Sequence, residues 1–402
     1  MYLEEQFYLY HFADHLIQHE HFKVLHFNIQ KNELWLMKRK WRQTKIVRLI
    51  QQGFDWKNHL KNDIASLFNR IHHLERHIGG RNVEIYNVYI SRLEPVDDWE
   101  SLKQPIQLKS RYPLKMNVFY ITWDNRRREE KRLLEQIQAK TEYELSLPQP
   151  EKLESAVLQY KYKLQHAIYN RNKQVQQIFS YGRPIVTYVL LYINIVMFFL
   201  LEWFGGSTNT ETLVMFGAKY NPAIINGEWW RIVTSMFLHI GFVHLIMNMI
   251  ALYYLGIVVE RIFGSLRFTI IYFLAGISGG ITSFAFNQHI AAGASGALFG
   301  LFGALLFFGT VYKDLFRQTM GPNLLIILMI NLVFGFIVPQ IDMGAHLGGL
   351  IGGYIASAIV FVPKRSQIVV QIGAFLIYLL AMMSLAFFGY LVNLQWMRDM
   401  FL

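Results

Sequence analysis

The sequence of 402 residues predicts a polytopic all-α membrane domain with an N-terminal soluble α/β domain. Hydrophobic residues make up 53% of the chain and the mean hydropathy is +0.22, values too apolar for a soluble chain of this length. The charge is unevenly distributed, because residues 1–178 hold 29 of the 39 Lys and Arg residues and 21 of the 28 Asp and Glu residues. The chain therefore divides into a charged region and an apolar region.

The charged region alternates between the periodicities of strands and helices. Segments rich in β-branched and aromatic residues predict five short strands, at Phe22–Asn28, Glu33–Met37, Lys45–Leu49, Val83–Ile90 and Met116–Trp123. Apolar residues at helical spacing predict helices at Trp56–His77 and Arg126–Lys140. We assign residues 1–150 to a cytoplasmic α/β domain with a regulatory or partner-binding role, and residues 151–183 to a helical linker.

The apolar region contains seven segments long enough to span a bilayer. They are residues 184–204, 242–259, 268–287, 295–312, 323–339, 344–362 and 368–393. The first six belong to a six-helix core at residues 184–362, and residues 363–402 form a seventh transmembrane helix with a short extracellular tail. Lys and Arg concentrate in alternate loops, which predicts a cytoplasmic N-terminus and an extracellular C-terminus.

Four polar residues stand near the beginnings of spans that run in the same direction. His244 and Asn248 begin the second span, Ser295 the fourth and His346 the sixth. Ionisable side chains at membrane depth are costly unless they have partners, so these residues are expected to meet. Ser295 would attack a carbonyl group, with His346 as general base and then general acid. The His244 and Asn248 side chains, with the Ser295 amide, would stabilise the tetrahedral intermediate.

Small residues predict how the fourth and sixth spans approach each other. Gly296 and Gly300 on one span, and Gly349 and Gly353 on the other, form small-xxx-small faces that allow close helix contact. The nearest acidic residue, Asp342, is expected in the preceding loop, which predicts a dyad without a carboxylate orienter. Stacking on Phe299, one turn after Ser295, would position the His346 ring instead.

Five motifs in this region resemble those of the rhomboid family of intramembrane serine proteases. They are Gly293-x-Ser295-Gly296, Ala345-His346-x-x-Gly349-x-x-x-Gly353, His239-x4-His244-x3-Asn248, Trp230-Arg231, and Glu260-x3-Gly264. Together they cover about residues 180–362, in the family's order. The seventh span and the large N-terminal domain resemble the Gram-positive bacterial subgroup of that family.

This resemblance implies a location and an activity. It implies cleavage of transmembrane protein substrates near the extracytoplasmic face of a bacterial cell membrane, with Ser295 and His346 as the dyad. His244, Asn248 and Gly293 in the loop before Ser295 would form the oxyanion hole. The partners expected are these substrates and the lipid bilayer, and a membrane quality-control protease is left open as a further partner.

Other interpretations stay open for several of these features. A G-x-S-G motif alone is more typical of helix packing, and a non-catalytic protein of the same fold that binds membrane clients is the alternative function. Glu260 is expected to anchor a loop, and Trp229, Trp230 and Arg231 to stabilise one. His239 is expected to cap or hydrogen-bond at the interface, with direct contact to the oxyanion as the alternative. The net charge of +11 favours anionic lipid over nucleic acid, since no nucleic-acid signature accompanies it.

No cofactor is expected to be required for the reaction, and the absence of cysteine excludes thiol catalysis. His11, His15 and His19 recur every four residues, and His73 and His77 repeat that spacing. Such pairs can chelate a divalent cation, which would act as a regulator of the N-terminal domain. A helix face that is rich in histidine without binding metal is the alternative.

Overall fold

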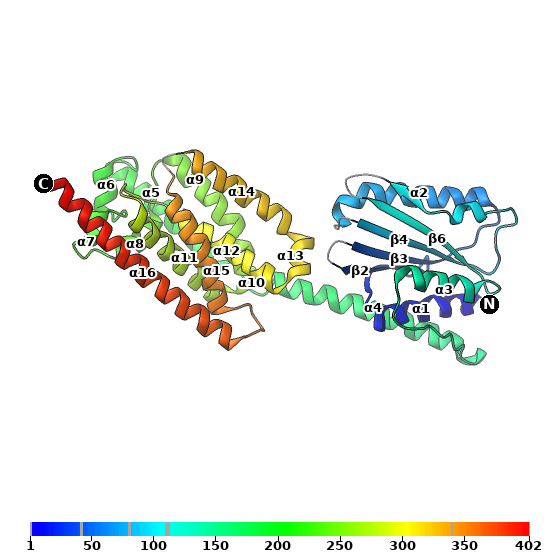
Figure 1. Cartoon of the computed structure of the whole chain (residues 1–402). Helices are drawn as coiled ribbons and strands as arrows, with labels where there is room; N and C mark the ends of the chain where they lie inside the picture. The colour runs from blue at the N-terminus through cyan, green and yellow to red at the C-terminus, as the bar shows by residue number, and fades with distance from the viewer. Residues whose placement is uncertain (1, 41–42, 79–81, 109–112, 339–340, 402) are drawn as a thin grey trace. The chain divides into compact units, whose positions relative to one another are not determined.

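The computed structural model describes residues 2–40, 43–78, 82–108, 113–338 and 341–401. Within it the chain forms two compact units, residues 1–173 and 174–402, shown in Figure 1. The first is a mixed sheet with helices, and the second is helical. This division confirms the predicted fold class.

The first unit is built on a six-stranded sheet with the order β1-β2-β3-β4-β6-β5. The strands are β1 (Lys23–Asn28), β2 (Glu33–Lys40), β3 (Gln43–Gln51), β4 (Asn82–Ile90), β5 (Ile106–Leu108) and β6 (Leu114–Ile121). β3, β4 and β6 are parallel, and the other neighbouring pairs are antiparallel. All five predicted strands are present. β5 was not predicted, because three residues are too few to show an alternating pattern.

Helices cover both faces of this sheet. α1 (Tyr2–Gln18) and α3 (Arg126–Ile137) lie on one face and α2 (Lys57–Ile78) on the other, as Figure 1 shows. Successive side chains of a strand point to opposite faces, so Val47 packs in the core beneath α1 while Ile46 packs in the core beneath α2. Burial on both faces explains why β3 is apolar at nearly every position in its second half.

The predicted linker is helical, as α4 (Pro150–Phe179). Its first half packs into the soluble unit, where Leu153, Val157 and Leu164 are buried in the same core as α1. The α/β unit therefore extends along this helix, beyond residue 150.

All seven predicted apolar segments of the second unit are helical. They correspond to α5 (Ile185–Trp203), α9 with α10 (Phe242–Ala251 and Ile257–Phe263, joined by a π-helical turn), α11 (Ser265–Phe286), α12 (Ser295–Val311), α14 (Gly321–Ile337), α15 (Met343–Val360) and α16 (Ile368–Phe401). By length and composition, five of these described segments could cross a membrane alone. A sixth would do so only if α13 (Lys313–Thr319) and α14, which meet at 72°, count as one span.

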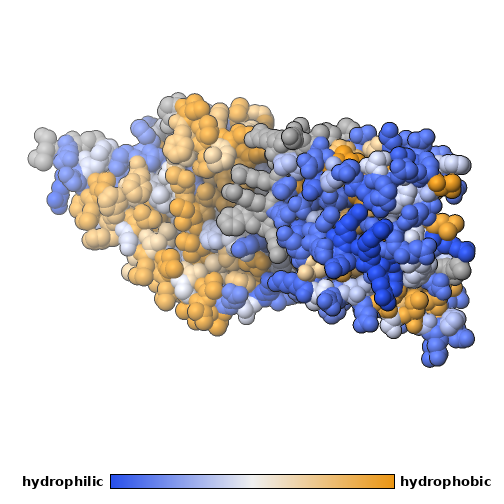
Figure 2. Space-filling model, turned by 45° about the vertical axis from the view of Figure 1, so that its right-hand side comes forward, coloured by the Kyte–Doolittle hydropathy of each residue, from blue (hydrophilic) through white to orange (hydrophobic). Residues whose placement is uncertain are grey.

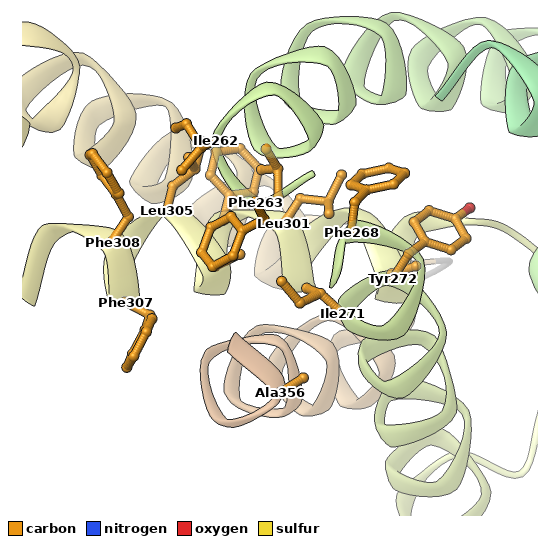
Figure 3. Close-up of a cluster of buried hydrophobic side chains, with 14 of the residues drawn as sticks. Ile262, Phe263, Phe268, Ile271, Tyr272, Leu301, Leu305, Phe307, Phe308 and Ala356 are labelled. Atoms are coloured by element: carbon orange, nitrogen blue, oxygen red, sulfur yellow. The ribbon is translucent and has the colours of Figure 1, made fainter. Parts of the chain in front are cut away.

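α12 is shorter than a full span, with 17 residues. Its length is about 26 Å, less than the roughly 30 Å of bilayer hydrocarbon. Nearly every side of α12 is buried, and in Figure 3 Leu301 lies between Phe263 of α10 and Phe268 of α11, while Leu305 lies beside Ile262 of α10. α12 is therefore the central helix of the unit. Where one end of this short helix lies within the hydrocarbon layer, the neighbouring helices can shield its terminal polar groups from lipid.

The outer helices turn apolar side chains outward. Ile330 on α14 and Leu380 on α16 are more than half exposed, and Figure 2 shows apolar residues gathered over this unit while the other unit is largely hydrophilic. Since apolar patches of this extent are rare on soluble proteins, the surface fits a multi-pass membrane protein.

The connection between α5 and α9 carries short helices α6 (Thr210–Met215), α7 (Asn221–Ile225) and α8 (Arg231–Thr234), followed by a 3-10 turn at Ser235–Phe237. Arg231 holds it together: its guanidinium donates to the Val214 carbonyl at 2.6 Å and pairs with Glu228 at 2.6 Å. The predicted stabilising role of Arg231 is confirmed.

Glu260, on α10, anchors the start of α5. Its carboxylate is fully buried and accepts hydrogen bonds from the backbone N–H groups of Val186 and Thr187 at 2.9 and 2.8 Å. A carboxylate at a helix N-terminus satisfies donors that lack partners within the helix. The expected structural role of Glu260 is confirmed.

Candidate active site

Ser295 is the first residue of α12 and is partly exposed. The first backbone N–H groups of a helix have no partner within it, so the Ser295 hydroxyl stands beside available donors. Such donors, together with the positive end of the helix dipole, favour negative charge at this point. A nucleophile here would attack next to a site that stabilises an oxyanion.

His346 lies in the first turn of α15 and is 8% exposed. Its ring stacks on Phe299, with centroids 4.1 Å apart and an interplanar angle of 15°. The predicted stacking is confirmed. Because Phe299 lies one turn after Ser295, this contact puts the imidazole against the same face of α12 that carries the serine.

Asp342 caps the helix that carries His346. Its carboxylate accepts a hydrogen bond from Ala345 N at 2.9 Å, and also from the Ser283 hydroxyl and the Asn287 amide. Among the described residues it makes no hydrogen bond to the imidazole, and His346 Nδ1 is buried without a partner. This geometry agrees with a dyad that has no carboxylate orienter.

Glycines bring α12 and α15 into backbone contact, as predicted. A Cβ atom at Gly296 would lie 3.3 Å from the Ala345 carbonyl oxygen, so the residues next to Ser295 and His346 are adjacent. A Cβ atom at Gly349 would overlap the Gly296 carbonyl, and one at Gly353 would overlap Gly300. Larger side chains at these positions would force the two helices apart.

Within the part of the chain that the structure describes, Ser295 and His346 lie at the adjoining ends of α12 and α15 and share no hydrogen bond. Catalytic hydrogen bonds are often long in free enzymes and tighten when substrate binds. The structure thus brings the two predicted residues to one site and leaves the proton-transfer contact unformed.

His244, Gly293 and Ser295 converge on one point. A Cβ atom at Gly293 would lie 3.0 Å from His244 Nε2 and 3.8 Å from Ser295 Oγ. Asn248, one turn after His244, is buried and donates to the His244 carbonyl at 2.8 Å. An amide has two N–H donors, so Asn248 keeps one for an oxyanion. His244 and Gly293 therefore lie beside the serine, and the part of Asn248 in an oxyanion hole stays a prediction.

His239 is fully buried and lies edge-on against His244, with ring centroids 5.4 Å apart. Neither of its ring nitrogens has a hydrogen-bond partner among the described residues. Direct contact of His239 with an oxyanion stays a prediction.

Several residues of this region were not predicted from sequence. Ser283 and Asn287, on and after α11, hold the Asp342 carboxylate, and the buried Lys219 donates to the Asn287 carbonyl at 2.7 Å. One available signal was the position of Asp342 three residues before Ala345, since Asp is a preferred N-cap.

Gly293→Ala is expected to reduce activity at least about tenfold while the protein stays folded. Gly293 has φ +152, a conformation that residues with a Cβ rarely adopt, and the added methyl group would displace the His244 ring. Cleavage rates of the wild-type and variant proteins, with Gly206→Ala as a control at a glycine of positive φ and open surroundings, test this. Equal cleavage rates for Gly293→Ala and wild type would contradict the assignment of Gly293 to the active site.

The histidines of the soluble unit do not form a recognisable metal site among the described residues, which contain no group of three or more metal-binding side chains. His11 contacts the Tyr143 hydroxyl at 2.9 Å and His15 contacts the Thr141 hydroxyl at 3.2 Å, while the His15 and His19 rings lie 4.9 Å apart. Burial lowers the pKa of His11 and of His15, which favours the neutral form that binds metals. The side chains of His73 and His77 lie outside those described. A regulatory cation stays a prediction.

Comparison with known proteins agrees with this geometry. A model of the rhomboid domain matches residues 226–363. Rhomboid protease GluP of Bacillus subtilis (strain 168) is 38% identical over 348 residues, which are 83% of this chain and 65% of that relative, so the chain spans about two thirds of its length. YdcA of the same organism, named as a candidate rhomboid protease, is 35% identical over 187 residues, 46% of this chain and 92% of its own. RHOMBOID-like protein 6, mitochondrial, of Arabidopsis thaliana is 39% identical over 164 residues, 39% of this chain and 52% of its own. The chain belongs to the rhomboid family.

Proposed function

We propose that the chain is an intramembrane serine endopeptidase that cleaves transmembrane protein substrates near the extracytoplasmic face through Ser295 and His346. The observation that supports this best is the convergence of Ser295, His244 and Gly293 beside a His346 ring stacked on Phe299. A binding protein would have no use for a partly exposed serine at a helix N-terminus next to buried histidines.

In this mechanism Ser295 Oγ attacks the scissile carbonyl carbon as its proton passes to His346. The oxyanion that forms accepts hydrogen bonds from the backbone N–H at Ser295 and from the side chains of His244 and Asn248. His346 then gives the proton to the leaving amine, and water repeats the sequence on the acyl-enzyme. The stacked Phe299 ring and the cap at Asp342 keep the imidazole in place without a carboxylate on its ring.

Fluorophosphonate labelling separates this function from the alternative of a non-catalytic client-binding protein. We expect one equivalent of label on Ser295, identified by peptide mass spectrometry, because only an activated serine reacts at an appreciable rate. Denatured protein is the control. A folded protein that binds a transmembrane client but takes up no label would support the binding function instead.

We further propose that the protein lies in a bacterial cell membrane with its N-terminus in the cytoplasm and its C-terminus outside. The basic loops between alternate helices support this orientation. The α/β unit would then regulate the protease or bind a partner such as a membrane quality-control protease.

A further inference from the structure

A fully buried asparagine stands out on the largely apolar α16. Asn393 is fully buried, and its amide donates to the Phe284 carbonyl on α11 at 2.8 Å and accepts from Asn221 Nδ2 at 2.7 Å. Polar side chains inside membrane segments are costly and tend to have a function. The side chain of Asn393 thus connects α16 both to α11 and to α7.

The same cluster holds the end of α11. Asn221 Nδ2 also lies 3.0 Å from the Asn287 carbonyl oxygen, which accepts a second hydrogen bond from Lys219 Nζ at 2.7 Å. Asn287 is the C-cap residue of α11, directly after Phe286. Asn393 therefore supports a cluster that fixes the position of Asn287.

Asn287 also contacts the residue that caps α15, the helix that carries His346. Its side chain donates to Asp342 Oδ2 at 2.7 Å, and Asp342 caps α15 through Ala345 N. The backbone N–H of His346 donates to the Asp342 carbonyl at 3.1 Å. Hydrogen bonds through Asn221, Asn287 and Asp342 therefore connect Asn393 on α16 to the backbone of His346.

We propose that Asn393 is a positioning residue for His346, acting through Asn221, Asn287 and Asp342. This inference rests on the proposed proteolytic function. The Phe299 ring restricts the tilt of the imidazole. The position of His346 along the axis of α12 depends instead on the cap at the N-terminus of α15. Loss of the Asn393 side chain removes one hydrogen-bond partner from Asn221 and one from the Phe284 carbonyl, so the end of α11 is held less firmly and shifts with Asp342.

α16 offers a matched comparison for this role. Tyr378 docks the same helix by donating to the Leu274 carbonyl at 2.8 Å, in the middle of α11. Within the described residues, none of the hydrogen bonds of Tyr378 leads to Asp342. Tyr378→Phe therefore weakens the docking of α16 without disturbing the cap of α15.

The test measures kcat, KM and the thermal midpoint of full-length protein in proteoliposomes with a model transmembrane substrate. For Asn393→Leu we expect kcat to fall about ten- to a hundredfold, the effect of a slightly misplaced catalytic group, with KM unchanged. Tyr378→Phe should keep the wild-type kcat. Asp342→Ala combined with Asn393→Leu should lose no more kcat than Asp342→Ala alone, since both act on one path.

The outcomes separate this inference from the proposed function. Wild-type protein without cleavage would refute the proposed function, whatever the variants do. Active wild-type protein refutes the positioning role if Asn393→Leu keeps the wild-type kcat, if Tyr378→Phe loses as much kcat as Asn393→Leu, or if the losses in the double variant multiply.

Discussion

Cleavage of a transmembrane substrate is expected to fall by about four orders of magnitude or more in Ser295→Ala and in His346→Ala. Ser295 Oγ would form the acyl bond, and it lies 3.8 Å from the position that a Cβ atom at Gly293 would take. Without His346 the proposed general base is lost, and Asp342 is not free to replace it because Ala345, Ser283 and Asn287 engage its carboxylate. Each loss should appear in kcat, since the residues act in the transition state.

This prediction is measured by following product formation in proteoliposomes that contain equal amounts of folded protein. Ser357→Ala is a suitable control, because Ser357 is a buried serine of α15 whose hydroxyl donates to the Gly353 carbonyl of its own helix, at 2.7 Å. The double variant Ser295→Ala with His346→Ala should be no less active than Ser295→Ala, since the two residues act as a unit. Wild-type rates in either single variant would contradict the dyad.

Gly349→Ala is expected to lower the free energy of unfolding by about 3 kcal/mol, and to lower activity by roughly a hundredfold. Overpacking by a methyl group commonly costs about 1–3 kcal/mol. Here the obstacle is the backbone carbonyl of Gly296, which no side-chain rotation can relieve. Separating the helices by about 1 Å would also move His346 away from Ser295, at a cost in rate of roughly a hundredfold.

Gly373→Ala provides the control for this variant. Gly373 lies in α16, and a Cβ atom there would have no neighbour within 4 Å. Alanine favours helix more than glycine does, so Gly373→Ala should be neutral or slightly stabilising. Thermal unfolding in one detergent compares the two. If Gly349→Ala were as stable and active as Gly373→Ala, the close contact between α12 and α15 would be refuted.

Much of the fold and of the site was predictable because the signals are local. Apolar runs identify the seven helical segments, and α12 departs from expectation only in its length. The stacking of His346 on Phe299 was predicted because Phe299 lies one helical turn after Ser295. The glycine contacts followed in the same way, since each depends on the spacing within a single helix.

Long-range partners were not predictable in this way. The hydrogen bond between Asn393 and Asn221 joins residues 172 positions apart, and neither sequence neighbourhood indicates the other. Asp342 was expected in a loop, but its two side-chain partners, Ser283 on α11 and Asn287 directly after α11, precede it by more than fifty residues. Such contacts depend on which helices become neighbours, and helical periodicity alone does not specify that.

The amino-acid sequence by itself determined the two regions, most of their secondary structure, and the candidate serine, histidine and asparagine residues, because hydrophobic periodicity and short motifs are properties of adjacent residues. Only the tertiary structure decided that Ser283 and Asn287 hold the Asp342 carboxylate at the cap of α15, and that Asn393 joins α16 to the end of α11. The reason is physical. A buried polar group takes the partners that the packing of distant helices brings within hydrogen-bond distance.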